Sequence, residues 1–126
     1  MMMNNYAGKR IMEGYFFMSS YKSEEMVQKK IEETQLLCLK NGVLLTAVGI
    51  EHNPPSHKDI DRESIRQLMK DMESGQYDVL VLRSLRDICS DGADWENFIN
   101  LLGEYGVFVY SMEQGGIVFN NYEEDC

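Results

Sequence analysis

The chain alternates short apolar runs with amphipathic segments, and the two patterns predict different elements. Four runs have the length and the continuous apolar character of buried strands: 14–18, 43–50, 79–82 and 107–112. Three intervening segments repeat apolar residues at spacings of three and four, which predicts helices: 23–41, 62–74 and 92–103. This alternation predicts a three-layer α/β fold, in which a mainly parallel sheet of four to five strands carries helices on both faces.

The helix boundaries carry signals of their own. Ser23 is the predicted N-cap of the first helix, and Asn41-Gly42 is its predicted end. Asp61 is the predicted N-cap of the second helix, which Gly75 ends. The apolar stripes are Val27, Ile31, Thr34 and Cys38 in the first helix, Ile65, Leu68, Met69 and Met72 in the second, and Trp95, Phe98, Ile99 and Leu102 in the third.

A chain of 126 residues is long enough for one domain with a single core. We expect that domain to span residues 11–119, with Ile117 to Phe119 as an edge strand or hairpin arm. Residues 1–10 are polar and aperiodic, which predicts a disordered lead-in. Residues 120–126 form a predicted acidic tail.

The formal charge of −9 is distributed unevenly along the chain. All twelve lysines and arginines lie at or before Arg86, whereas nine carboxylates and no basic side chain follow it. A protein that binds nucleic acid unaided should present a basic face to the phosphates. We therefore expect this chain to bind DNA weakly or not at all by itself.

The cysteines and histidines give no sign of a metal or other cofactor. Cys38, Cys89 and Cys126 are odd in number and lack metal-like spacing, and His52 and His57 have no further ligands that the sequence identifies. No signal peptide is recognisable, and no apolar run approaches the ~20 residues of a membrane span. These features predict a reduced, cytoplasmic protein that does not enter a membrane.

Polar side chains follow two of the predicted strands. Ligands of doubly wound sheets bind beyond the carboxyl ends of the strands, so Ser19-Ser20 and the turn Ser84 to Asp91 should lie side by side. The run 19–23 lacks the glycines of a phosphate-binding loop, and on this pattern alone Ser19 is most simply a turn or capping serine. A nucleophilic serine would need a base or nearby cations. The candidate cations are Lys22, Arg62, Arg83 and Arg86.

These segments resemble motifs of the catalytic domain of resolvase/invertase-type serine recombinases. Tyr15 to Ser20 is similar to the family's opening strand, Y-x-R-V-S-(S/T), and Leu85 to Asp91 is similar to its L-D-R-L-x-R-D motif. Further similar segments follow in the family's order: Gln28, Asp61 to Glu63 with Leu68, Gly75 to Val79, and Gly106 to Glu113. The resemblance covers roughly residues 11–113 and implies a resolvase-like fold.

By this resemblance, Ser19 takes the place of the nucleophile that forms a 5′-phosphoserine linkage to DNA, and Arg62 that of an active-site arginine. Other residues occupy three further arginine positions: Phe17, Asp87 and Ser90. Loss of one such donor typically costs a factor of ~10²–10³ in rate, and the carboxylate of Asp87 adds repulsion toward phosphate. Arg86 replaces the motif's aspartate and could turn inward to compensate.

The family continues into a long dimer helix and a DNA-binding domain. Only thirteen residues follow Glu113, so we expect both parts to be missing. Apolar surface near Trp95–Leu102 and Val107–Met112 should then stay exposed unless Ile117 to Phe119 folds over it, and such a patch would mark the contact surface of a protein partner. In isolation we expect a monomer or weak homodimer.

Four hypotheses remain at this point. The first is a truncated, degenerate resolvase-like domain from a mobile-element lineage, catalytically impaired and acting through protein contacts. The second is an active recombinase domain that uses Ser19, Arg62 and a displaced Arg86. The third is an unrelated α/β module that binds a small anion at the strand ends, and the fourth is an acidic DNA mimic.

Overall fold

A five-stranded sheet forms the centre of the computed structural model, which describes residues 11–113 and 115–118. The strands are β1 (Met12–Ser20), β2 (Val43–His52), β3 (Val79–Leu82), β4 (Phe108–Ser111) and β5 (Gly116–Val118). Their order is β2-β1-β3-β4-β5, with the first four parallel and β5 antiparallel to β4. The predicted mainly parallel sheet is therefore confirmed, as is the predicted edge arm over residues 117 and 118.

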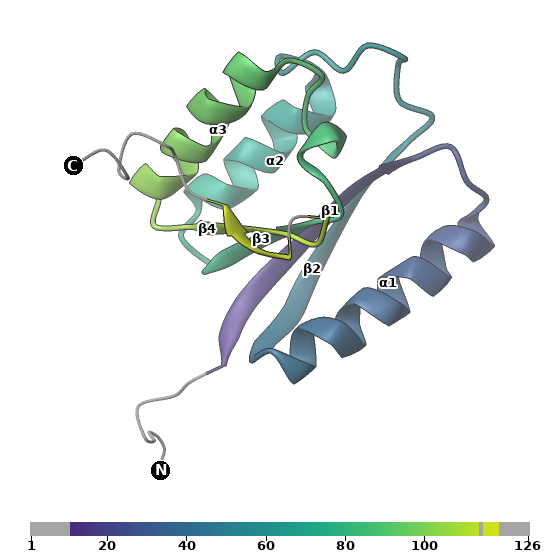
Figure 1. Cartoon of the computed structure of the whole chain (residues 1–126), viewed down its shortest axis with the longest axis vertical. Helices are drawn as coiled ribbons and strands as arrows, with labels where there is room; N and C mark the ends of the chain where they lie inside the picture. Colours follow the sequence, from purple (N-terminus) through teal and green to yellow (C-terminus); the bar gives the residue numbers. More distant parts are fainter. Residues whose placement is uncertain (1–10, 114, 119–126) are drawn as a thin grey trace.

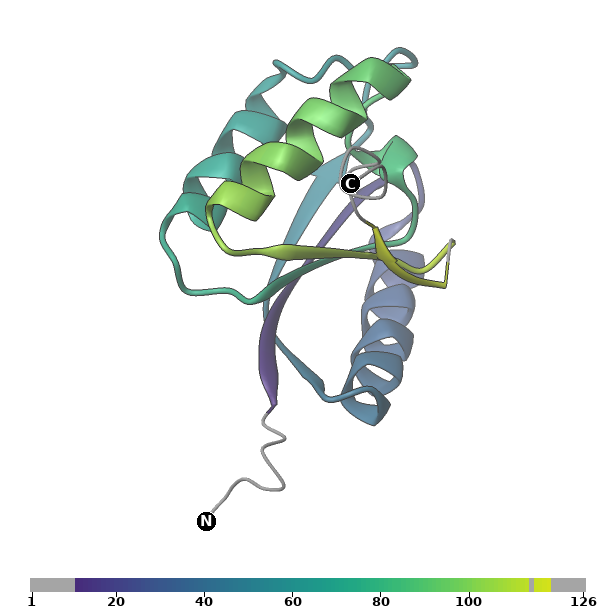
Figure 2. The same ribbon diagram turned by 60° about the vertical axis from the view of Figure 1, so that its left-hand side comes forward.

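Helices cover both faces of this sheet, as the sequence predicts. They are α1 (Glu24–Lys40), α2 (Glu63–Glu73) and α3 (Gly92–Glu104), with a single 3₁₀ turn, η1 (Leu85–Asp87), after β3. Helix α1 lies on one face, and α2 and α3 lie side by side on the other (Figures 1 and 2). A separate group of buried apolar side chains fills each of the two interfaces, so the domain has three layers.

The helix ends agree with the sequence at α1 and differ at α2. The Ser23 hydroxyl accepts a hydrogen bond from the Met26 N–H, and Asn41 is the C-cap, so both predicted ends of α1 are confirmed. The prediction that Asp61 caps α2 is wrong, because Arg62 occupies the N-cap position without a side-chain cap. Asp61 is instead held in the preceding turn, where its N–H donates to the side chain of Asp59.

Strands β1 and β2 change register near their start. Gly14 lies opposite Leu45, but Tyr15 lies opposite Ala47, so Thr46 is an extra residue on β2. Such a bulge changes which residues of the two strands meet further along. Beyond it the pairing continues regularly to Ser20.

The expected exposure of the third helix stripe is wrong. Phe98 and Leu102 are buried against the sheet, and Trp95 and Ile99 are partly buried on the same core. The apolar side chains that remain exposed in this region are Leu101 at 38% and Phe108 at 50%. Any apolar contact surface here must therefore be built on a different set of side chains from the predicted stripe.

Two predicted segments lie outside the described residues: the lead-in 1–10 and the tail 120–126, together with Phe119. Among the helices that the structure describes, none is long and apolar enough to cross a membrane.

Gly49 on β2 offers a test of the close packing around Tyr15. A Cβ at Gly49 would lie 2.6 Å from the Tyr15 hydroxyl, which donates a hydrogen bond to Asp71 of α2. We expect Gly49→Ala to lower the free energy of unfolding by about 1–3 kcal/mol, because the buried ring must move. Gly103→Ala in α3 is the control: nothing lies within 4 Å of its Cβ position, and the change should stabilise by up to ~1 kcal/mol. Urea denaturation measures both, and equal effects would contradict this account.

Candidate active site at the carboxyl edge of the sheet

Ser19 lies near the carboxyl end of β1, directly opposite Glu51 of the neighbouring strand β2. Because the two strands are parallel and in register here, both side chains lie on the same face of the sheet. Ser19 is only 4% exposed, and its hydroxyl donates a hydrogen bond to a carboxylate oxygen of Glu51. The expected position of Ser19 at the strand ends, beside the turn Ser84 to Asp91, is confirmed by contacts described below.

The Glu51 carboxylate connects three other side chains at this edge. Besides the Ser19 hydroxyl, it accepts hydrogen bonds from the Ser64 hydroxyl at 2.6 Å and from Arg62 Nε and Nη2 at 2.7 and 2.9 Å. Burial alone would raise the pKa of the Glu51 carboxyl, but hydrogen bonds from Arg62, Ser19 and Ser64 outweigh it and lower the pKa to about 2. Glu51 is therefore an anion at neutral pH.

Arg62 uses every one of its five N–H groups within the protein. Three of them donate to backbone carbonyls: those of Asp59 and Asp87 at 2.8 Å each, and that of Ile88. The other two form the bidentate pair with Glu51. The guanidinium thus joins the end of β2 to η1 and to the turn before α2. The predicted juxtaposition of Arg62 with the serine is confirmed, with Glu51 between them.

Arg83 is the cation that contacts the backbone of Ser19. Strand β3 ends at Leu82, opposite Phe17, so the Ser19 backbone extends past its neighbour. Arg83 Nη2 donates to the Ser19 carbonyl at 2.7 Å, and Nε and Nη2 also reach the Asp87 carboxylate at 3.1 and 3.2 Å. The Arg83 side chain thus makes a hydrogen bond to the Ser19 carbonyl that a longer β3 would otherwise make.

Asp87 is held in this position against the cost of burial. Its side chain is 10% exposed, and burial raises the pKa of its carboxyl, an effect that the charge and hydrogen bonds of Arg83 only partly offset. Two of the arginines near Ser19 are therefore each paired with a carboxylate of the same chain, Arg62 with Glu51 and Arg83 with Asp87.

The other predicted site residues lie away from this cluster. Arg86 is exposed, and its side chain makes no hydrogen bond or ion pair with the residues the structure describes, so the inward turn suggested for it is wrong. Phe17 is buried in the core under α2 and α3. Ser90 is exposed, and its hydroxyl accepts from the Lys58 N–H at 2.9 Å. Lys22 is exposed as well.

Sequence reasoning missed Glu51 and Ser64. The predicted strand ended at Ile50, one residue short of Glu51. The rule that located Ser19, namely that polar residues just past a strand gather at one edge, would also have found Glu51. Ser64 had no comparable signal, because its role depends on how α2 packs beside β2. Within the described ranges no group of three potential metal ligands is present.

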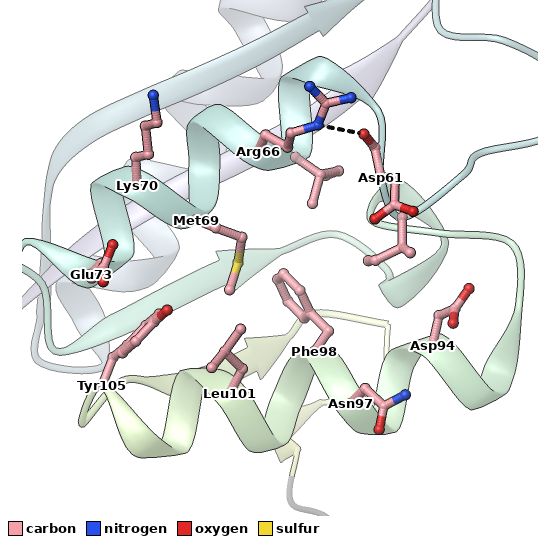
Figure 3. A pocket seen from close by; sticks show the side chains of 12 residues that line it. Asp61, Arg66, Met69, Lys70, Glu73, Asp94, Asn97, Phe98, Leu101 and Tyr105 are labelled. Atoms are coloured by element: carbon pink, nitrogen blue, oxygen red, sulfur yellow. Dashed lines mark hydrogen bonds between the residues drawn. The ribbon is translucent and has the colours of Figure 1, made fainter.

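A groove of about 450 Å³ lies between α2 and α3, away from the Ser19 cluster (Figure 3). Met69, Phe98 and Leu101 point into it from the two helices. Arg66 and Lys70 of α2 line one side, and Asp94 of α3 lines the other. None of the predicted site residues lines this groove.

Comparisons with known proteins agree with this architecture. A family model described as "Resolvase, N terminal domain" matches residues 13–125. The solved N-terminal catalytic domain of TP901-1 integrase superposes with a TM-score of 0.68 at 11% identity, over 81% of this chain and 78% of that chain. No curated protein matches the chain.

Two further solved structures share the fold. The C-terminal catalytic domain of ISC1926 TnpA, an IS607-like serine recombinase, gives a TM-score of 0.67 at 16% identity, over 80% of this chain and 70% of that chain. A resolvase family site-specific recombinase from Streptococcus pneumoniae gives 0.65 at 15% identity, over 84% and 75% respectively.

The low pKa of Glu51 leads to a testable pH dependence. A carboxyl whose pKa is lower in the folded chain contributes stability above its usual pKa near 4.5, and this contribution is lost as the pH falls toward 2. We expect Glu51→Gln to be less stable than the wild type at pH 7, by up to ~3 kcal/mol, and the difference to shrink as the pH falls from 4.5 to 2. Urea denaturation at a series of pH values measures this.

Glu63→Gln is the matched control, because the Glu63 side chain is 84% exposed and pairs with Arg66 on the surface. Its stability curve should run parallel to that of the wild type. Parallel curves for Glu51→Gln as well would contradict the role of Glu51 as the buried partner of Arg62.

Proposed function

Because the chain belongs to the resolvase N-terminal domain family, we propose that it is a serine recombinase catalytic-type domain in which Ser19 holds the nucleophile's place without cutting DNA. We further propose that such a domain, from a mobile-element lineage, acts through contacts with protein.

One observation carries the first part of this proposal: the arginines beside Ser19 already have anionic partners. Phosphoryl transfer needs donors that are free to meet the charge developing on the phosphate oxygens. All five N–H groups of Arg62 are in use, and Arg83 is bound to Asp87. A phosphate could reach the Arg62 guanidinium only by displacing a carboxylate or a backbone carbonyl, and at Arg83 it would compete with the Asp87 carboxylate for Nε and Nη2.

The partner of the Ser19 hydroxyl is also poorly suited to activate it. A general base works best when its pKa lies near the working pH. The pKa of Glu51 is about 2, so its carboxylate accepts the hydrogen bond but has little tendency to take the proton.

The alternative is an active recombinase domain that forms a 5′-phosphoserine linkage through Ser19. Two contacts support this alternative. A hydrogen bond to Glu51 orients the Ser19 hydroxyl, and Arg83 donates a hydrogen bond to the Ser19 carbonyl. This alternative requires a rearranged site, in which Asp87 or Glu51 releases its arginine for the phosphate.

Incubation with DNA distinguishes the proposed inactive domain from the active alternative. We expect no covalent protein–DNA adduct when the purified chain meets a pool of supercoiled and linear duplexes, because the charge-stabilising donors are occupied. Duplex binding at physiological salt should be no tighter than ~10⁻⁴ M. Denaturing gels detect the adduct, and Ser19→Ala is the control. An adduct that forms with the wild type and disappears in Ser19→Ala would establish the active alternative.

The proposed protein contact is a weak homodimer through the groove between α2 and α3. Its support is the apolar centre of the groove, which is surrounded by charged side chains of both signs: Asp61, Arg66, Lys70 and Glu73 on one side and Asp94 of α3 on the other (Figure 3). A two-fold axis along the groove would lay α2 of each copy over α3 of the other. The α2 side of the groove would then face Asp94 of the second copy, and the exposed Leu101 would lie in the apolar centre of the contact.

Sedimentation equilibrium tests this surface. We expect a monomer or weak homodimer whose association constant falls at least about tenfold (~1.4 kcal/mol) in Leu101→Glu, because a charge would enter the apolar centre. Leu36→Glu is the control: Leu36 is 66% exposed on α1, and the association constant should not change. An effect of the control as large as that of Leu101→Glu would refute the assignment.

A further inference from the structure

We infer that the outer edge of β2 is a docking site for an extended, basic segment of another protein, which adds a strand to the sheet. The inference rests on the proposed function, since it names a kind of partner for a domain that acts through contacts with protein. None of the residues that line the groove between α2 and α3 belongs to β2 or α1, so the two surfaces are separate.

β2 lies at one end of the strand order and, among the residues that the structure describes, pairs with β1 alone. Every second residue of such an edge strand directs its backbone N–H and C=O groups outward, where another strand can pair with them. β2 is ten residues long, whereas β5 at the opposite end of the described sheet has three. The β2 edge therefore offers the longer template for an added strand.

The composition of β2 leaves this edge open to pairing. Edge strands usually avoid added strands through prolines, lysines or bulges, whereas Val43 to Ile50 contains no proline and no charged residue. The bulge at Thr46 lies near the start of the strand, and the pairing with β1 is regular over residues 47–52. Leu44 is 47% exposed and Val48 is 37% exposed, so apolar side chains flank the free backbone. A partner strand therefore meets hydrogen-bonding groups and apolar contacts at the same edge.

Helix α1, which runs beside β2 (Figure 1), places carboxylates along one face of this edge. Leu37 lines a cavity together with Val79 and Val81 of β3, so its side of the helix faces the centre of the sheet. The opposite side, about 180° around the helix, faces the β2 edge. Four exposed residues lie on that side: Glu24, Gln28, Glu32 and Leu39.

Helix α2 places a further carboxylate on the other face of the sheet. Asp71 of α2 accepts a hydrogen bond from the Tyr15 hydroxyl, which lies beside Gly49 of β2. The basic side chains of α2, Arg66 and Lys70, instead line the groove toward α3. The side of α2 next to β2 thus carries a carboxylate without the basic residues of the helix.

These carboxylates favour a basic partner. Glu24, Glu32 and Asp71 form no ion pair within the part of the chain that the structure describes. Unpaired carboxylates on both faces of a strand favour lysine or arginine in the segment that pairs with it, and the formal charge of −9 attracts such a segment from a distance. β2 itself contains no lysine or arginine, so a second copy of this strand does not supply them.

A peptide titration tests this edge without DNA. The probe is a labelled peptide of about nine residues that alternates valine or threonine with lysine. It is added to the Leu101→Glu variant, so that the groove homodimer does not contribute. We expect a dissociation constant of ~0.1 mM or lower at low salt, and binding at least about tenfold weaker when glutamate replaces lysine in the peptide. Amide hydrogen exchange of β2 should slow when the lysine peptide binds.

A matched pair of substitutions on α1 tests the role of the carboxylates. Glu32→Lys should weaken binding of the lysine peptide at least about fivefold, because it places a cation beside the cations of the peptide. Glu33→Lys makes the same change in charge one turn from Leu37, on the side of α1 that faces the centre of the sheet. Its effect should be less than about twofold. Both positions are exposed, so neither change should impair folding.

Each outcome decides the matter. Absence of binding, binding that leaves β2 exchange unchanged, or equal effects of the two substitutions would overturn the edge site. Equal binding of the lysine and glutamate peptides would overturn the assignment to a basic segment. Slower β2 exchange at higher protein concentration without peptide would show that a second copy occupies the edge, which also overturns that assignment. A covalent DNA adduct with the wild type would refute the proposed function instead, since the titration involves no DNA.

Discussion

The buried ion pair between Glu51 and Arg62 organises the whole carboxyl edge of the sheet. A charge removed from water is costly unless it is paired and fully hydrogen-bonded, so neither partner can leave alone. Glu51 fixes the pair to β2 and to the Ser19 hydroxyl, and Arg62 fixes it to η1 through the carbonyls of Asp87 and Ile88. The serine, the turn after β3 and the start of α2 are thereby held as one unit.

A second ion pair, between Arg83 and Asp87, lies on the other side of Ser19. An enzyme that stabilises a charged transition state keeps its donors oriented and available before the substrate arrives. Here the fold of the family is retained, and the two arginines Arg62 and Arg83 each have a carboxylate partner within the chain.

The sequence predicted the elements better than the site. Continuous apolar runs and regular helical stripes are local signals, and all three helices begin and end within one residue of expectation. The direction in which a side chain points from a turn is not determined by the local sequence. Arg83 contacts Ser19, whereas Arg86, three residues further along, faces solvent. Ser64 was missed for the same reason, because its contact with Glu51 depends on how α2 packs beside β2.

The bulge in β2 has a consequence for how relatives of this chain are compared. If the two strands paired without a bulge, Thr46 would lie opposite Tyr15. Ile50 instead of Glu51 would then lie opposite Ser19. The acid therefore reaches the serine through an irregularity five residues upstream. An alignment of relatives that closes this one-residue gap shifts the acid by one column and conceals whether a given relative has it.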